Sequence, residues 1–220
     1  MRRIARLVAA LVAAASLALV AFEGFALWRA KQRTPEVLAE AAKGDLELSS
    51  IPKARLAMLL KVEDPGFYDH RGVDFSTPGA GATSITQSLV KRFYFDRFKP
   101  GFAKLEQSLI ARFVLDPAMS KPAQLKAYLN HSYLGHFRGR AVIGFADAAR
   151  TYYGRGLDQL TDREFLSLVA MAMAPNRLDP VRHPGENAER MRRIEALIAG
   201  KCKPAGHRDV TYEACAAVAR

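Results

Sequence analysis

The stretch that decides the fold is VEDPGFYDHRGVD, which runs from Val62 to Asp74. Two adjacent acids, Glu63 and Asp64, close an apolar run, and a proline, two glycines, two aromatic residues and a histidine follow within ten residues. A polar helix terminus followed by a turn is the simplest interpretation of this composition. A catalytic carboxylate held at a helix end is the alternative, and the rest of the chain has to decide between them.

Length and charge limit the class of protein. The chain has 220 residues, half of them hydrophobic, which is enough for one sizeable domain and a small appendage. Its formal net charge of +11 favours an anionic partner, such as a membrane surface or a phosphate-bearing substrate. Because the basic residues are spread along the chain, without an RNP-type motif or zinc-finger spacing, the sequence argues against a nucleic-acid partner.

The N-terminal segment, residues 1–30, is predicted to be a transmembrane anchor. Three arginines precede residues 7–22, which are all apolar or small, and the apolar segment that continues to Trp28 approaches the ~20 residues needed to span a bilayer. Positive charge before the span predicts a single pass with the N-terminus in the cytoplasm and the rest of the chain outside. A cleaved signal peptide is the alternative, but this apolar stretch is longer than a usual signal-peptide core.

The remaining chain divides into three further segments. Residues 31–50 are polar and mixed in charge and are expected to form a juxtamembrane linker, residues 51–200 a domain, and residues 201–220 a C-terminal tail. Cys202 and Cys215 lie in that tail and would form a disulfide in an oxidising compartment, or remain two free thiols. The sequence has no CxxC or HExxH pattern and so no sign of a zinc site.

Within the domain, the pattern predicts mainly α-helices. Ala54, Ala57 and Leu60 lie near helical spacing before the acid pair. Ser120 is a good N-cap for the segment SKPAQLKAYLNHSYLG, and Thr161 with Glu164 forms a capping box. No strand-rich region is evident, so the fold class is mainly α.

The opening stretch is the first of four sequence motifs that occur in order along the chain. EDPGFYDHRG resembles the first signature, E-D-x-x-F-x-x-H-x-G, of family 51 glycosyltransferases, the peptidoglycan glycosyltransferase domains of penicillin-binding proteins and their monofunctional relatives. GATSITQSLVK resembles the second signature, LKAYLNHSYLG the fourth, and the segment that begins GFADAARTYYG the fifth. The four signatures occur in family order and cover roughly residues 51 to 198.

The resemblance implies a lysozyme-like helical glycosyltransferase domain with a membrane-dipping small lobe. It implies lipid II as the substrate, extension of a nascent glycan strand, and release of undecaprenyl pyrophosphate. It places the domain on the periplasmic or extracellular face of the bacterial inner membrane, beside other cell wall synthesis proteins. A membrane anchor and a basic surface agree with a lipid-linked pyrophosphate substrate.

The resemblance also implies roles for individual residues. Glu63 would be the base that takes the proton of the acceptor hydroxyl, since a carboxylate with a raised pKa suits this task. Cations would stabilise the departing pyrophosphate, and a divalent metal, Mg²⁺ or Mn²⁺, often binds there in the family, although no metal ligand is predicted in the chain. His70 is expected to brace the Glu63 loop rather than transfer protons. The predicted substrate-binding residues are Asp64, Phe67, His70, Ser84, Thr86, Gln87, Lys91, Arg92, Lys99 and Lys104.

Several of these residues have a simpler interpretation. Lys91, Arg92, Lys99 and Lys104 could form a solvated basic face near anionic lipids. Tyr128 and Asn130 are expected to be structural, through ring packing and a helix C-cap. SLVK, residues 88–91, fits the S-x-x-K of penicillin-reactive enzymes, but no K-T-G follows and the chain is too short for a transpeptidase domain.

The third and fourth signatures depart from the family pattern. Glu106 is the predicted second catalytic acid, but it lies one residue early when counted from Lys91 and two early, relative to Ser108, when counted back from the next helix. Lys126 stands where the fourth signature has a glutamate. Two hypotheses follow: a divergent glycosyltransferase, or a degenerate domain that binds lipid II or glycan in wall assembly. A lysozyme-type hydrolase is a third, disfavoured by the anchor and the ITQ motif.

Overall fold

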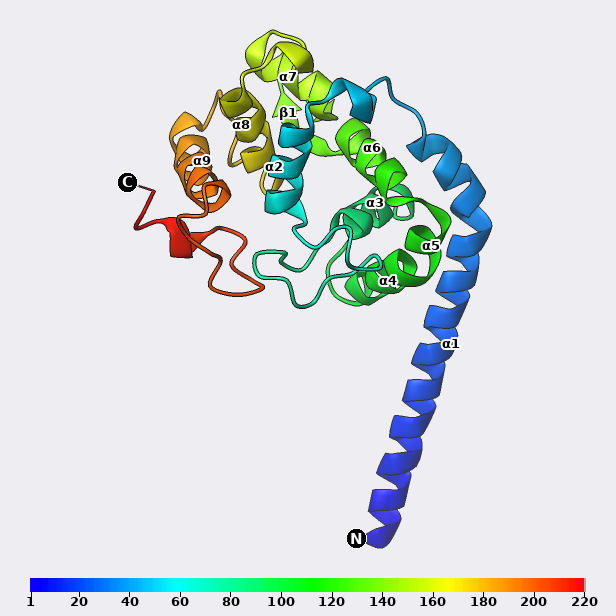
Figure 1. Ribbon diagram of the computed structural model, residues 1–220. Coiled ribbons are helices and arrows are strands. Elements are labelled where there is room, and N and C mark those ends of the chain that lie inside the picture. The colour runs from blue at the N-terminus through cyan, green and yellow to red at the C-terminus, as the bar shows by residue number, and fades with distance from the viewer. Residues whose placement is uncertain (220) are drawn as a thin grey trace.

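The computed structural model describes residues 1–219 and confirms the mainly helical fold (Figure 1). A π-helical turn, Ala111–Leu115, joins α4 to α5, and 3-10 turns lie at Leu48–Ser50, Leu157–Gln159 and Glu213–Cys215. The helices and strands are α1 (Arg2–Ala41), α2 (Lys53–Glu63), α3 (Ile85–Phe93), α4 (Phe102–Ile110), α5 (Asp116–Ala118), α6 (Lys121–His131), β1 (Tyr133–Phe137), β2 (Arg140–Ile143), α7 (Phe145–Tyr153), α8 (Asp162–Ala172) and α9 (Pro184–Ile198).

Helix α1 is a rod that leaves the domain, as Figure 1 shows. It contains an 18-residue window of mean hydropathy 2.3 with no buried residue, so it is long and apolar enough to cross a membrane. The last turns of the same helix pack on the domain through Ala30, Thr34, Val37 and Ala41, which recur every three or four residues. Because Thr34 Oγ1 also lies 3.0 Å from Tyr94 Oη, the base of the rod is fixed to the end of α3.

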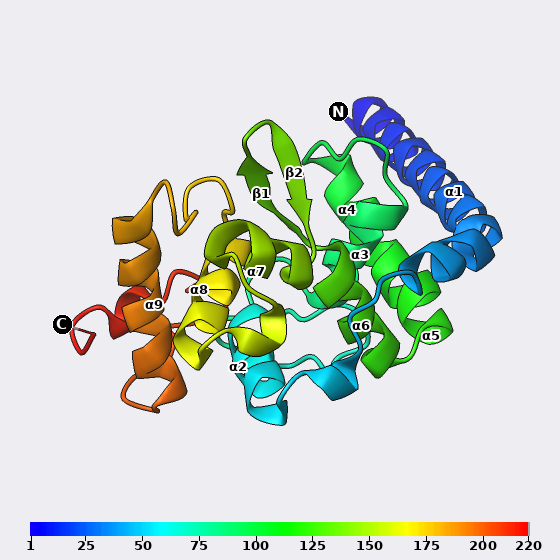
Figure 2. The ribbon, with the colours of Figure 1, turned by 90° about the horizontal axis from the view of Figure 1, so that it is seen from above.

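The core of the domain is built around α8. Phe165 to Met171 are all buried in this helix, which packs against α2, α7 and α9. A helix that is apolar all round has to be covered on every side, and this explains why segments from both halves of the chain surround α8. Figures 1 and 2 show α1 and α9 at opposite ends of the resulting domain.

Helix α2 reaches α8 through a buried arginine. Arg55 donates to Asp162 Oδ1 at 2.7 Å and to the main-chain carbonyls of Leu157 and Leu160. Its guanidinium also lies 5.7 Å from the ring centre of Phe165. The inward face of α2 is therefore Arg55, Leu59 and Val62, and not the face of Ala54 and Ala57 that the sequence pattern suggested.

A two-stranded antiparallel hairpin follows α6, where the sequence pattern showed no sign of strands and the segment SKPAQLKAYLNHSYLG was expected to be helical (Figure 2). Helix α6 ends at His131, and Phe137 pairs with Arg140 across a two-residue turn. The turn residues Arg138 and Gly139 have φ of 49° and 79°, which matches the turn type that joins twisted strands. The expected N-caps Ser120 and Thr161, in contrast, are confirmed, because each side chain accepts a backbone N–H of its helix.

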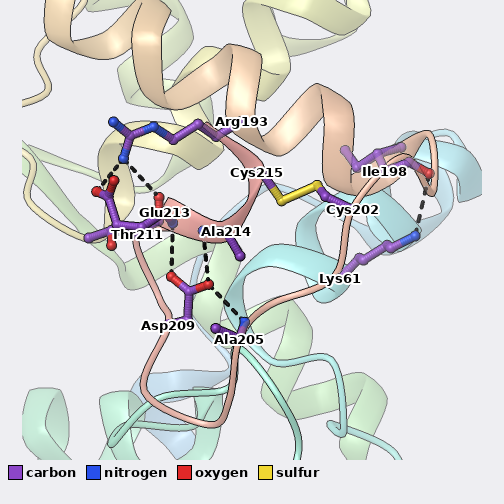
Figure 3. Close-up of a disulfide and its surroundings, with 10 residues drawn as sticks. All are labelled: Lys61, Arg193, Ile198, Cys202, Ala205, Asp209, Thr211, Glu213, Ala214 and Cys215. Atoms are coloured by element: carbon purple, nitrogen blue, oxygen red, sulfur yellow. Dashed lines mark hydrogen bonds and ion pairs between the residues drawn. A yellow bond between two sulfur atoms is a disulfide. The ribbon is translucent and has the colours of Figure 1, made fainter. Parts of the chain in front are cut away.

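The C-terminal tail is closed by a disulfide between Cys202 and Cys215, which confirms the disulfide interpretation (Figure 3). The tail lies against α9, where Arg193 reaches Glu213 and the carbonyl of Thr211. Tyr212 is buried, and its hydroxyl donates to the carbonyl of Val62 at 2.7 Å. The end of the chain therefore supports the end of α2.

We expect Arg55→Met to lower the free energy of unfolding by about 2–4 kcal/mol, because two buried carbonyls lose their donor. In a protein of this size the melting temperature should fall by roughly 5–15 °C. Thermal unfolding of the full-length protein in detergent, followed by circular dichroism, measures the change. Lys53→Met, at an exposed position of the same helix, is the matched control and should shift stability by less than about 0.5 kcal/mol. Equal melting temperatures for the two variants would contradict the assignment.

Candidate functional site

The acid pair at the end of α2 divides between the core and the surface. Asp64 is 1% exposed; its Oδ2 accepts the backbone N–H of Ile85 at 2.8 Å, and its Oδ1 lies 2.9 Å from Nε2 of His70. This carboxylate therefore accepts a hydrogen bond from the first residue of α3 and contacts His70 in the loop after α2. Glu63, one residue earlier, is only partly buried and faces a groove.

The groove has a volume of about 660 Å³ and runs between the ends of several helices. Its walls come from the end of α2, the loop before α3, α3 itself, the loop after α3, α6, the end of α8, α9 and the tail. The charged and aromatic residues that line it are Glu63, Lys91, Arg92, Phe95, Asp96, Phe98, Tyr128, His131, Tyr133 and Arg190.

Glu63 has one strong hydrogen-bond partner. The hydroxyl of Tyr128 donates to Glu63 Oε2 at 2.8 Å. Burial raises the pKa of Glu63 above its ordinary value of 4.5, while the Tyr128 hydrogen bond and the positive charge of Arg190 act in the opposite direction. Burial and the neighbouring carboxylate also raise the pKa of Tyr128, so the phenol keeps its proton and remains a donor. The result is a carboxylate whose pKa is raised, which is the direction that suits a general base.

Cations gather at the α3 side of the groove. Lys91 and Arg92 lie in the last turn of α3 and are exposed. Lys104 on α4 donates to Thr83 Oγ1 at 2.9 Å, and burial together with repulsion from Lys91 lowers its pKa. Two ammonium groups that repel one another are a favourable place for an anion, because the anion removes the repulsion. Lys104 does not line the groove itself, and neither does Lys99, which is exposed.

The second motif turns most of its polar side chains inward. Ser84 lines the groove with part of its surface, but its hydroxyl donates to the carbonyl of Gly72 and accepts the N–H of Gln87, so it caps α3. Thr86 is fully buried and donates to Gln124 Oε1 at 2.6 Å. Gln87 Oε1 accepts the N–H of Ser84. The structure therefore gives Thr86 and Gln87 structural contacts and does not bring them into the groove.

The predicted binding residues of the first motif, which follow Glu63, also point into the core and away from the groove. Phe67 is 1% exposed, and the ammonium group of Lys121 lies 4.7 Å from its ring centre, so neither the ring nor its face is open to a ligand. His70 contacts Asp64 and so braces the loop through a neighbour of Glu63. Asp64, Phe67 and His70 shape the site from inside the core and do not line the groove.

Glu106 is not in the groove either. Helix α4 packs against α1, and the Glu106 carboxylate lies close enough to Glu23 of α1 for the two charges to interact. The residues that α4 directs toward α3 are Gln107, which donates to the carbonyl of Gln87, and Ser108, which accepts from the Gln87 amide. These are the two positions that the forward and backward counts indicated. A one-residue slip turns a helical side chain by about 100°, so Glu106 points elsewhere.

Two residues of the site were missed or misread by sequence reasoning. Tyr128, expected to be structural, is the hydrogen-bond partner of Glu63. Arg190 was not considered, although it lines the groove from α9. A spacing on α6 could have revealed Tyr128, because Gln124 and Tyr128 are buried polar residues four positions apart on that helix. No local pattern marks Arg190.

Comparisons with known proteins show the family of the chain. A family model described as Transglycosylase matches residues 31–198. A Cupriavidus necator protein named as a transglycosylase is 33% identical over 155 residues, 65% of each chain. Penicillin-binding protein 1F of Bacillus subtilis and penicillin-binding protein 1B of Vibrio cholerae are each 31% identical over 166 residues, 70% of this chain.

The chain spans only part of these relatives. It covers 65% of the Cupriavidus necator protein and about a fifth of the two penicillin-binding proteins, 22% and 21%. The family match, in contrast, includes every helix from the base of α1 to the end of α9 and contains Glu63, Tyr128 and Arg190. The chain therefore belongs to the transglycosylase family, glycosyltransferase family 51, whose helical fold is lysozyme-like.

Proposed function

We propose that this domain is a peptidoglycan glycosyltransferase that extends a glycan strand from lipid II and releases undecaprenyl pyrophosphate. The observation that carries the proposal is the Glu63 carboxylate, partly buried at a helix end and held by Tyr128 in a groove whose other side is cationic. A base and an anion-binding side in one groove match a reaction that removes a proton from one sugar and a pyrophosphate from another.

Each part of the groove has a role in this reaction. Glu63 takes the proton of the acceptor 4-hydroxyl, and the acceptor oxygen forms a bond to the anomeric carbon of the donor. The bond between that carbon and the pyrophosphate oxygen breaks, and the pyrophosphate leaves with the electron pair. Lys91 and Arg92, assisted by Lys104 behind Thr83, stabilise its charge. Tyr128 orients the carboxylate and remains protonated.

The membrane helix would keep this groove beside a lipid-linked substrate. Helix α1 packs against α4, and Phe102 at the start of α4 is exposed, as is Phe75 in the loop before α3. An exposed aromatic side chain on a helix that packs against α1 suits contact with lipid, and a second exposed ring adds apolar surface to the domain. The arginines that precede the apolar segment favour an N-terminus in the cytoplasm and a catalytic domain at the outer face of a bacterial inner membrane.

A divalent ion would have to be held by the substrate as much as by the protein. Among residues 1–219, no three His, Cys, Asp or Glu side chains gather in the way that a metal site needs. The groove offers Glu63 and Asp96 as carboxylates. Mg²⁺ or Mn²⁺ would therefore arrive on the pyrophosphate oxygens, and the roles given above use only side chains of the chain itself.

Glu63→Gln should abolish polymerisation of labelled lipid II by the full-length protein, with a loss of about 10²–10⁴-fold, because the amide cannot accept the proton. Glu106→Gln is the matched control. Since Glu106 does not line the groove, this variant should retain activity within about twofold. Gel analysis of the glycan products, with and without added Mg²⁺ or Mn²⁺, measures both variants.

The outcomes separate the hypotheses. Activity of Glu63→Gln within tenfold of the wild type would remove Glu63 as the base. A wild type that binds lipid II without polymer under all metal conditions would favour the binding role in wall assembly. Shortened glycans from wall material would indicate a hydrolase.

The same substitution should stabilise the fold in a pH-dependent way. The folded protein binds the Glu63 proton more tightly than the unfolded chain does, so ionisation of Glu63 lowers stability. This loss is absent below the ordinary pKa of 4.5 and complete above the raised pKa of the folded protein. Glu63→Gln should therefore raise the melting temperature at pH 8 and leave it nearly unchanged at pH 4. An equal shift at both pH values would show that ionisation is not its cause.

A further inference from the structure

The tail beyond the family match forms part of the groove. Residues 202–215, which we call the disulfide loop, lie against the loop that precedes α3. The N–H of Gly79 donates to the carbonyl of Gly206 at 3.0 Å, and the N–H of Gly81 donates to the carbonyl of His207 at 2.8 Å. Gly79, Gly81 and Val210 all line the groove. One wall is thus two strips of chain joined by main-chain hydrogen bonds.

The two glycines make this contact possible. A Cβ atom on Gly79 would lie 2.9 Å from Cγ of Pro204, and one on Gly81 would lie 2.3 Å from Cγ1 of Val210. Both glycines also have positive φ, 81° and 69°. Because a larger residue would be both strained and obstructed, the sequence of this loop fits the disulfide loop closely.

The disulfide loop also holds the helix end that carries Glu63. Tyr212 is buried, and its hydroxyl donates to the carbonyl of Val62, the residue before Glu63. Its ring lies under the guanidinium of Arg190, 5.5 Å from the ring centre. One side chain of the tail thus touches both the end of α2 and the arginine of α9.

Arg190 is oriented by these contacts. It is 7% exposed, its Nε donates to the carbonyl of Ala170 at 2.9 Å, and its Nη1 donates to the carbonyl of Val210 at 2.8 Å. The positive charge lines the groove and interacts with the Glu63 carboxylate. A guanidinium with two fixed donors has little freedom to turn away.

Covalent and polar links keep the disulfide loop in one shape, as Figure 3 shows. Cys202 follows α9 and is bonded to the buried Cys215. Between them, Asp209 accepts the backbone N–H groups of Ala205 and Glu213 at 3.0 and 2.9 Å. The loop is therefore a preformed support, and the disulfide is the bond that closes it.

We propose that the disulfide loop is a positioning element of the groove, and that it holds Arg190 as a positioning residue beside the Glu63 carboxylate. The predicted effect of Arg190 on activity rests on the proposed function. The predicted effect of Arg190 on the titration of Glu63 is independent of the proposed function. The groups that interact with Glu63 are Asp64 in the adjoining loop, Tyr128 of α6, Arg190 of α9 and Tyr212 of the disulfide loop. The other charged or ionisable groups that line the same groove are Lys91 and Arg92 of α3, Asp96 after α3, His131 of α6 and Tyr133 of β1.

The first test compares Arg190→Gln with Arg190→Lys and Arg192→Gln in the full-length protein. Arg192 is the matched control, because it is an exposed arginine of the same helix with no hydrogen bond or ion pair to any residue in the range 1–219. The readouts are the pH of half-maximal lipid II polymerisation on the acidic side and a carbon-13 NMR titration of Glu63. The Glu63 resonance is assigned by its loss in Glu63→Gln.

We expect Arg190→Gln to move both midpoints upward by about one pH unit, because loss of a nearby positive charge disfavours the carboxylate. Arg190→Lys should restore most of the shift, and Arg192→Gln should show none. Unchanged midpoints in Arg190→Gln would overturn the inference, even if activity fell. A wild type without polymerase activity but with the expected NMR shift would refute the proposed function alone.

The second test removes the disulfide by the double substitution Cys202→Ser and Cys215→Ser, with circular dichroism as the check on folding. The midpoints should shift in the direction seen for Arg190→Gln, because Val210 and Tyr212 no longer hold the guanidinium. Adding Arg190→Gln to this variant should produce little further shift, since contacting residues are not additive. Full additivity, or no shift in the folded double variant, would contradict positioning by the loop. If that variant does not fold, Tyr212→Phe and Tyr212→Leu test the same contact.

Discussion

The carboxylate of Asp64 is the contact on which the site depends. It is buried, and an isolated buried charge is costly unless strong donors surround it. The N–H of Ile85 is a free donor at the first turn of α3, where the helix dipole also favours a negative charge, and His70 supplies a second contact. Asp64 thereby ties the end of α2 to the start of α3. Because adjacent residues cannot face the same way on a helix, the same contact turns Glu63 outward, and this answers why two acids stand together.

Ionisation of Glu63 lowers the stability of the fold, and the proposed role of Glu63 as a base would account for an acid in this position. Burial raises the pKa of Glu63, so the charged form is disfavoured in the folded protein. Tyr128 and Arg190 reduce that penalty without cancelling it, so the pKa of the Glu63 carboxyl stays raised. Both partners come from segments distant in the sequence. Tyr128 lies on α6, and Arg190 lies on α9 and contacts the C-terminal tail. The chemistry of one residue thus depends on the order of the whole domain.

Local rules predicted much of the fold, because the information they need lies within a few residues. The caps at Ser120 and Thr161 follow from side chains that bond to their own helix. Long-range contacts were not accessible in this way. The hairpin after α6 was missed because its strands are short and its pairing is decided by a turn, and the inward direction of Thr86 and Gln87 depends on Gln124 and Ser108, far along the chain. The sequence motifs indicated a glycosyltransferase, but they did not indicate which of their residues line the groove.

The departures from the family pattern have unequal consequences for the groove. Lys126, the charge reversal in the fourth motif, pairs with Glu47 before α2 and does not line the groove. The third motif is different, because the two positions that face Gln87 are an amide and a hydroxyl, and neither can carry a negative charge. Lys91, Arg92 and Arg190 then exceed the carboxylates Glu63 and Asp96 in the groove lining. Such an excess of positive charge favours an anionic ligand, as the proposed reaction requires, and Glu63 is the one partly buried acid among the described residues that line the groove.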